Sequence, residues 1–366
     1  MSVEIPLLNP EILAGIQSLK ESPKMAKALQ IAFEEADFGM QEQVELCEIP
    51  APTFEEDVRA EEIVRRMKSY GLTDVHIDDI GNVIGFRPGK GNGPVLAIGA
   101  HMDTVFPAGT DVTVRQEGNR YYGPGIGDNC SGLRALLQII RSLNKADVQT
   151  EGDIYFVATV GEEGLGDIRG SKHFVATHKI DGFLAIDNTE IGRILRGAVG
   201  SHRYRVTIEG PGGHSYGNFG EVGSAIHAMC IAGNMIAHLK TPSDPKTTFT
   251  IGTIKGGTSV NTIAPSCSVE IDMRSLDNDE LLKIEAQILA CFDKAVAEEN
   301  AIWNISDPAK QVRWKKEGIG DRPAGMRPAD CPVLQVSRSA LEALGQKLTN
   351  YGVSSTDANA PVSLGI

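Results

Sequence analysis

Three short, nearly all-apolar runs constrain the fold of this chain more than any other feature of its sequence. They are VLAIGAH (95–101), IYFVATV (154–160) and FLAID (183–187). Between them lies at least one helical pattern, GLRALLQIIRSL (132–143). Short apolar strands that alternate with helices are typical of a mainly parallel sheet buried on both faces. The sequence therefore predicts an α/β domain.

The segments that flank these runs complete this domain. Helices are expected after Pro10 and Ser22, and another from Thr53, where Thr53 and Glu56 fit a capping box. DVHIDD and NVIGFRP, with Gly81 between them, predict a hairpin, and PVLQVSRSALEALGQ (332–346) predicts a helix near the end.

The pattern changes near Gly197. SHRYRVTIEG and CSVEIDMRS alternate polar and apolar residues, and helical patterns follow at 221–240 and 277–301. With further strands around TTFTIGTIKGG and QVRWKKEG, this indicates an α+β layer with helices on one face. We expect a second domain at 198–322, inserted into a discontinuous first domain formed by 1–197 plus 323–366. The length of 366 residues allows two domains.

Composition excludes several classes of protein. The formal charge of -13 and the aromatic content of 5% argue against nucleic-acid binding. No apolar run approaches the roughly 18–20 residues of a membrane span, and the N-terminus does not read as a signal peptide. The six cysteines are scattered without a CxxC pair, which favours reduced thiols and a cytoplasmic location.

Acidic residues and one histidine gather where the apolar runs end. Ligands of open α/β sheets bind outside the carboxyl ends of the strands. The residues are His101, Asp103, Asp128, Glu162, Glu163 and Asp187.

Each of these residues also has a purely structural interpretation. His101 could make a core hydrogen bond with Asp103 as a turn cap, Asp128 could cap the helix that follows it, and Asp187 could be a turn residue. The adjacent Glu162 and Glu163 are more specific, since two carboxylates after a buried strand repel each other and need a counter-charge. A divalent cation would supply it, bound by one glutamate while the other acts as general base.

One histidine with several carboxylates forms a nitrogen and oxygen ligand set that suits Zn²⁺, Mn²⁺ or Co²⁺. Two such ions about 3.5–4 Å apart, bridged by a carboxylate, would activate water and polarise a carbonyl. No GxSxG elbow, Walker A loop or GxGxxG turn competes with this interpretation.

These motifs resemble the M20 family of co-catalytic zinc peptidases and deacylases. The resemblance rests on HMDTV (101–105), GPGIGDN (123–129), GEEG (161–164), Asp187, GPGGHS (210–215) and DMRS (272–275). RPAG (322–325) and SSTDAN (354–359) are most similar to the peptidase T branch. The resemblance implies a mainly parallel-sheet catalytic domain, an inserted lid and dimerisation domain, and two divalent metal ions, with zinc the first choice and cobalt or manganese as alternatives.

The resemblance also implies a role for each matched residue. His101 and Asp187 would bind one metal, Asp128 would bridge both, and Glu163 would bind the other. Glu162 would be the general base that takes a proton from metal-bound water. Asp103 would be the partner of His101.

In the lid, the resemblance implies that His214 stabilises the oxyanion, in dimeric members at the active site of the partner subunit. Asn261 and Arg274 match positions that contact substrate, and Arg274 suits a carboxylate. From the residues alone, His214 could merely bond its own loop and Arg274 could form a surface ion pair.

The leading hypothesis is a homodimeric metallopeptidase that hydrolyses small peptides, as a dipeptidase, tripeptidase or aminopeptidase. One alternative is an N-acyl-amino-acid deacylase or carboxypeptidase with the same site. Another is a catalytically impaired fragment, because the family has a further metal-binding histidine near its C-terminus and the last histidine here is His238. The sequence is therefore expected to be truncated at its C-terminus. Whether a second metal ion binds without this histidine is left open by the sequence. The bridging motif also has Asn129 after Asp128 instead of a second acid.

Overall fold

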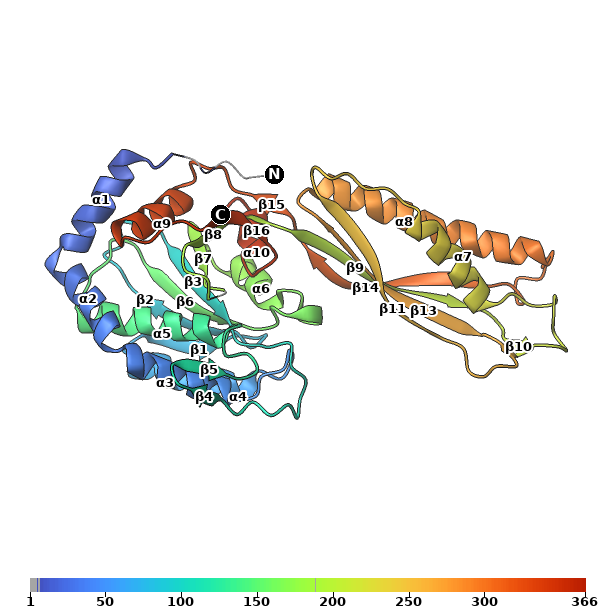
Figure 1. Cartoon of the computed structure of the whole chain (residues 1–366), viewed down its shortest axis with the longest axis horizontal. Helices are drawn as coiled ribbons and strands as arrows, with labels where there is room; N and C mark the ends of the chain where they lie inside the picture. Colours follow the sequence, from blue (N-terminus) through green and yellow to red (C-terminus); the bar gives the residue numbers. More distant parts are fainter. Residues whose placement is uncertain (1–4, 6, 188) are drawn as a thin grey trace. The chain divides into compact units, whose positions relative to one another are not determined.

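The structure is a computed structural model that describes residues 5, 7–187 and 189–366 (Figure 1). The chain divides into two compact units. Unit 1 comprises Met1–Ala198 and Met326–Ile366, and unit 2 comprises Val199–Gly325. Within the described residues, no helix combines the length and the apolar character that a membrane crossing requires.

A five-stranded sheet forms the centre of unit 1. Its strands lie in the order β1 (Thr73–Ile77), β2 (Val83–Arg87), β6 (Ile154–Thr159), β3 (Leu96–His101) and β7 (Gly182–Ala185). The three apolar runs form β3, β6 and β7, and β3 pairs in parallel with both others. β1 and β2 form the expected hairpin and pair antiparallel. The predicted α/β class is confirmed.

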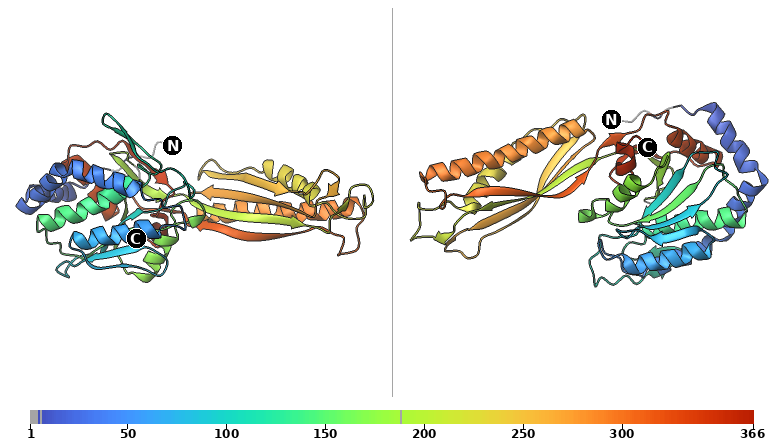
Figure 2. Two further views of the ribbon diagram at one scale, coloured as in Figure 1. Left: turned by 90° about the horizontal axis from the view of Figure 1, so that it is seen from below. Right: turned by 180° about the vertical axis from the view of Figure 1, so that it is seen from behind.

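Helices cover both faces of this sheet (Figure 2). One face packs against α3 (Ala36–Cys47), α4 (Asp57–Ser69) and α5 (Cys130–Lys145), and the other against α6 (Arg169–Thr177). The neighbouring residues Phe156 and Val157 of β6 point to opposite faces and are both fully buried. This two-sided burial explains why the run is apolar throughout. Two further helices, α1 (Pro10–Glu21) and α2 (Pro23–Glu34), begin at the expected positions.

The start of α4 differs from the sequence prediction. The helix begins at Asp57, and neither Thr53 nor Glu56 makes the expected cap. The Thr53 hydroxyl instead donates to the Asp103 carboxylate at 2.8 Å. The Glu56 carboxylate accepts from the backbone N–H of Gly161 at 3.0 Å. The capping-box prediction was wrong because both side chains bond to distant strand ends.

A smaller sheet in unit 1 has the order β15 (Gly325–Met326), β8 (Arg193–Ala198) and β16 (Asn350–Ser354). Two helices follow β15 along the chain, α9 (Pro332–Ala343) before β16 and α10 (Asn359–Ser363) after it. β4 (Arg115–Glu117) and β5 (Arg120–Tyr122) form a separate short hairpin.

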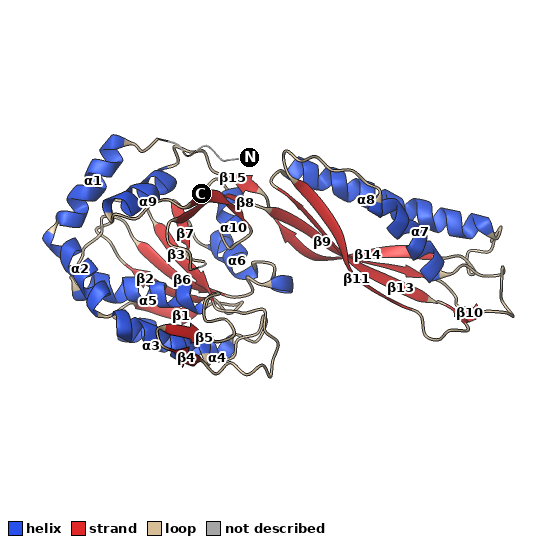
Figure 3. Cartoon of the chain, viewed as in Figure 1, coloured by secondary structure: helices blue, strands red, loops and turns tan. Residues whose placement is uncertain are grey.

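Unit 2 is an antiparallel sheet with helices on one face (Figure 3). The strand order is β11 (Thr247–Gly256), β13 (Ser266–Ser275), β9 (Gly200–Glu209) and β14 (Arg313–Arg322). The helices α7 (Ala225–Ala237) and α8 (Asn278–Ile302) share one apolar core with the sheet. The predicted α+β layer is therefore confirmed. A two-stranded ribbon, β10 (Gly213–His214) and β12 (Thr262–Ile263), extends from this unit.

Candidate active site

His101 is the last residue of β3 and is buried there, with 2% of its surface exposed. Its Nδ1 lies 3.0 Å from the backbone carbonyl oxygen of Asp103, and its Nε2 lies 3.0 Å from Oδ1 of Asp128. Because a carbonyl only accepts, Nδ1 must carry the proton that it donates. Nε2 is then the ring atom available to a metal, which is the usual arrangement in metal sites.

Asp128 lies in the glycine-rich loop before α5, but it does not cap the helix. Asn129 does so, because its side chain accepts from the N–H of Gly132 at 3.0 Å. A Cβ on Gly132 would lie 2.2 Å from Oδ1 of Asn129, so this close approach requires glycine. The Asp128 carboxylate is left exposed and directed at His101.

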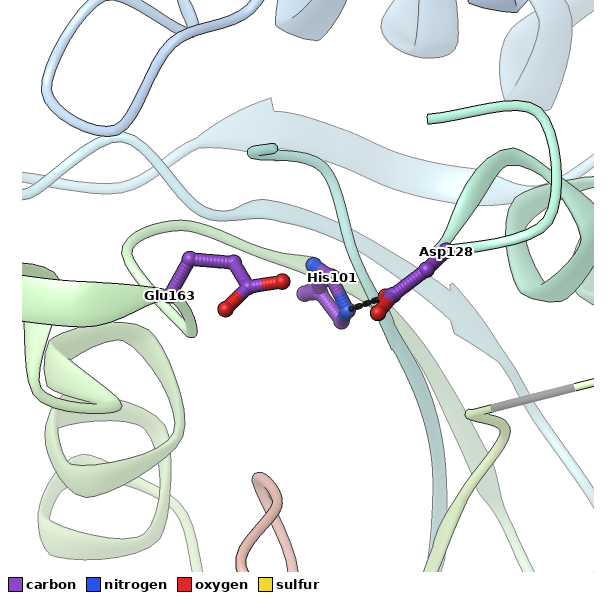
Figure 4. A group of neighbouring side chains, drawn as sticks. All are labelled: His101, Asp128 and Glu163. Carbon is purple, nitrogen blue, oxygen red and sulfur yellow. Dashed lines mark hydrogen bonds and ion pairs between the residues drawn. The ribbon is translucent and has the colours of Figure 1, made fainter. Parts of the chain in front are cut away.

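Glu163 completes a group of three side chains (Figure 4). One ligand atom each from His101, Asp128 and Glu163 lies within 4.8 Å of the others. Glu163 follows β6, so the group comes from the end of β3, the loop before α5 and the loop after β6. The preceding Glu162 is 5% exposed and adjoins this group.

The Asp103 carboxylate fixes the loop that carries both glutamates. Its Oδ1 accepts from the N–H of Glu162 at 2.9 Å, and its Oδ2 accepts from the N–H of Glu163 at 3.0 Å. Burial alone would raise the pKa of Asp103, but His101 and these two N–H groups outweigh it and lower the pKa. Asp103 therefore stays ionised.

Burial alone would lower the pKa of His101, but its acidic neighbours reverse the effect. Hydrogen bonds with Asp103 and Asp128 and the charge of Glu162 raise the pKa of His101 well above its ordinary value. Without a cation, a proton on this imidazole compensates the surrounding carboxylates.

Asp187 lies two residues beyond β7 and is not part of the group of three. It lines a cavity of about 520 Å³ in unit 1, together with residues of β8, α9 and α10. Its expected role as a metal ligand stays a prediction.

Sequence analysis missed several side chains around this site. Glu56 also pairs with Arg169, at 3.1 Å between Oε2 and Nη2. The Thr159 hydroxyl at the end of β6 donates to the buried carboxylate of Asp357. Burial raises the pKa of Asp357. Asp357 lies in the SSTDAN segment, which indicated the family resemblance. Nothing in that segment predicted that Asp357 would contact the end of β6.

In unit 2, His214 and Asn261 come together at the β10–β12 ribbon. The N–H of Ser215 donates to the backbone oxygen of Asn261 at 3.0 Å. Nδ1 of His214 accepts from the N–H groups of Tyr216 and Gly217, at 3.2 and 3.3 Å. These bonds leave Nε2–H of a neutral His214 as an exposed donor.

Arg274 lies near the other end of β13 from this ribbon. The strand from Ser266 to Arg274 spans about 26 Å at about 3.3 Å per residue. Its Nε donates to Oδ2 of Asp272 at 2.7 Å, and its side chain is 42% exposed. One copy of unit 2 therefore keeps Arg274 apart from His214 and Asn261.

The residues of the first group fit a divalent cation. They supply one imidazole nitrogen and carboxylate oxygens without a thiolate, as zinc, manganese and cobalt sites of hydrolases do. The side-chain amide of Asn129 donates to the backbone oxygen of Ile186 and so holds the Asp128 loop, and Asp103 holds the glutamates. The fold thus positions these candidate ligands.

Two family models match this chain. The peptidase dimerisation domain of the M20 peptidases matches residues 196–300, which include His214, Asn261 and Arg274. The model of peptidase family M28 matches residues 82–202, which include the strand-end residues of unit 1.

Among curated proteins, the chain is 37% identical over 121 residues to a Pyrococcus abyssi protein named for hydrolysis of LysW-lysine or LysW-ornithine. That alignment covers 33% of this chain and 32% of the relative. Carboxypeptidase G2 of a Pseudomonas species is 28% identical over 225 residues, 59% of this chain and 52% of the relative. The chain thus matches between about a third and about half of the length of these relatives.

The fold extends this similarity to nearly the whole chain. A tripeptidase from Staphylococcus aureus superposes with a TM-score of 0.73 over 90% of this chain and 87% of its own, at 23% identity. The inserted unit thus matches the dimerisation domain of M20 peptidases, and the chain is similar in fold to this tripeptidase.

Proposed function

We propose that this protein hydrolyses amide bonds of small peptides with the help of one or two divalent metal ions, zinc being the first choice. The observation that carries the proposal is the convergence of His101, Asp128 and Glu163 beside a buried Glu162. A carboxylate next to a cation site is the arrangement that metal-assisted hydrolysis requires.

In this proposal, Nε2 of His101 and the carboxylates of Asp128 and Glu163 hold the metal, and Asp187 completes the set. A bound cation would polarise the scissile carbonyl and neutralise the carboxylates. Glu162 takes a proton from the attacking water and returns it to the leaving amine. Asp103 keeps Glu162 in place through its backbone.

The lid residues would act on the substrate. The exposed Nε2–H of His214 suits a developing oxyanion, and Arg274 suits a substrate carboxylate. Since one copy keeps these two residues apart, His214 of the partner subunit would complete the site. A homodimer through unit 2 agrees with the dimerisation-domain match, and β11 offers an edge strand for it. The free cysteines agree with a cytoplasmic location.

Substitution of Glu162 tests the proposed chemistry. Hydrolysis of a tripeptide by the zinc-loaded Glu162→Gln variant should fall by about 10²–10⁴-fold while bound zinc is unchanged. Glu55→Gln, in an exposed position, is the matched control. Unchanged turnover in Glu162→Gln would contradict the role. A wild-type chain that binds less than one metal ion and hydrolyses nothing after zinc or cobalt addition would favour a non-catalytic protein.

A second candidate is an N-acyl-amino-acid deacylase or carboxypeptidase. The similarity to carboxypeptidase G2 favours it, and Arg274 suits a free carboxylate in either case. A panel of matched peptides with free and blocked N-termini separates the candidates. An aminopeptidase cleaves only the free forms, whereas a deacylase cleaves the acylated ones.

A further inference from the structure

A group of buried polar atoms without partners lies in unit 1, among β8, β16 and α9. Nε of Arg196, Nη1 of Arg338 and the hydroxyl of Tyr351 are all shielded from solvent. None of them has a hydrogen-bond partner among residues 5, 7–187 and 189–366. Neither arginine forms an ion pair within that part of the chain. Buried donors of this kind normally have an acceptor, and charged ones most of all.

A β-bulge directs Arg196 toward Tyr351. β8 and β16 pair in parallel, with Leu195 opposite Gly352 and Gly197 opposite Val353, so that Arg196 has no opposite residue. Its backbone oxygen instead accepts from the N–H of Arg327 at 2.8 Å. Bulges re-aim side chains and are frequent beside functional sites. Here the guanidinium carbon lies 5.7 Å from the centre of the Tyr351 ring.

Arg338 approaches the same tyrosine from α9. Leu334, one helical turn earlier, packs with Tyr351 in a small apolar cluster, so Arg338 lies on the same face of the helix. Burial raises the pKa of Tyr351, and the charges of Arg196 and Arg338 oppose this rise. Tyr351 is only 6% exposed. Two cations thus adjoin one buried hydroxyl, and neither forms an ion pair within the described ranges.

Two fully buried arginines of this unit form ion pairs, whereas Arg196 and Arg338, which are half-buried, form none among the described residues. Arg141 pairs with Glu35 at 3.0 Å and with Glu42 at 2.5 Å. Arg66 pairs with Glu42 and Glu45. Nε of Arg327, which follows β15, is likewise buried without a partner among the described residues, so the arginines without partners gather in this part of unit 1. Water would satisfy the hydrogen bonds at Arg196 and Arg338 without relieving the repulsion between their charges.

We propose that Arg196, Arg338 and Tyr351 form a binding site for an oxyanion, either a carboxylate or a phosphate group. Planar guanidinium groups match the oxygens of both groups, and the tyrosine hydroxyl adds a third donor. The site shares no residue with the proposed metal centre, and its test does not use enzymatic activity.

Calorimetric titration of the full, metal-free chain with inorganic phosphate and, separately, with succinate tests the proposal. Sodium chloride at equal ionic strength controls for general screening. We expect saturable binding of one anion per chain by at least one probe. Arg338→Met should raise its dissociation constant about tenfold, and Arg120→Met, which removes an exposed arginine of β5, should leave it unchanged. Phosphate-only binding would assign a phosphate ligand and succinate-only binding a carboxylate ligand.

Tyr351→Phe provides a variant that deletes only the hydroxyl oxygen. Without an anion its free energy of unfolding should fall by no more than about 1 kcal/mol, because the hydroxyl lies beside Arg196 without a well-formed hydrogen bond among the described residues. With a saturating anion it should gain less thermal stability than the wild type. The absence of saturable binding by both probes, equal weakening in Arg120→Met, or full binding in both Arg338→Met and Tyr351→Phe would overturn the proposal.

Discussion

Asp103 holds Glu162 through the backbone: Oδ1 of Asp103 accepts from the N–H of Glu162 at 2.9 Å. The other oxygen, Oδ2, accepts from the N–H of Glu163 at 3.0 Å and from the Thr53 hydroxyl at 2.8 Å. The bonds join the end of β3 to the loop after β6. They therefore set the position of the proposed base relative to His101.

Replacement of Asp103 by asparagine tests this connection. An amide offers one acceptor oxygen where the carboxylate offers two, and its NH₂ group would face backbone N–H donors. We expect a loss of about 3 kcal/mol in the free energy of unfolding and a 10- to 100-fold weaker zinc affinity, measured by chemical denaturation and by competition with a chelator. Thr53→Val removes one bond only and should lose about 1 kcal/mol. Wild-type zinc affinity in Asp103→Asn would contradict the connection.

Asp128 offers a substitution that separates metal binding from folding. Its side chain is 63% exposed, and Asn129, not Asp128, caps α5. We expect Asp128→Asn to lower the free energy of unfolding of the metal-free chain by only about 1 kcal/mol, because the bond from His101 keeps an oxygen acceptor but loses its charge. Zinc should raise the unfolding temperature of the wild type but not of this variant. An equal zinc-induced shift in both proteins would remove Asp128 from the ligand set.

The parts of the fold that follow from local patterns were predictable from the sequence. The apolar runs predicted β3, β6 and β7. A strand that is buried on both faces has apolar residues throughout and does not alternate between polar and apolar ones. Since parallel strands end at one edge, the same runs also explain why His101 and Glu163 lie close together.

The contacts between distant segments were not predictable. Thr53 and Glu56 have the spacing of a capping box, yet they bond to Asp103 and Gly161, 50 and 105 residues away. Asp357 meets Thr159 across 198 residues, and the bulge at Arg196 depends on the register of β16. No local pattern encodes such pairings, because only the assembled sheets bring these residues together.

Zinc binding should release a proton from His101. Its acidic neighbours raise the pKa of His101 in the metal-free chain well above the ordinary 6.5, so that near neutral pH it holds a proton that a metal must displace. Zinc affinity should therefore rise with pH up to this raised pKa and level off above it. Calorimetry at neutral pH in two buffers of different ionisation enthalpy measures the proton release. His101→Gln should abolish this release, and an affinity that is independent of pH would contradict the prediction.

Acid should destabilise unit 1 partly through Glu35. Burial alone would raise the pKa of Glu35, but Lys145, Arg141 and Gln138 outweigh it and lower the pKa below the ordinary 4.5. A carboxyl with a lowered native pKa stabilises the fold fully above its unfolded value, and this stabilisation is lost as the pH falls through the native value. The free energy of unfolding of the metal-free wild type should thus drop more between pH values of about 5.5 and about 3.5 than that of Glu35→Gln. Glu21→Gln, at an exposed position without an ion pair among the described residues, should match the wild type, and equal drops in all three proteins would exclude a contribution from Glu35.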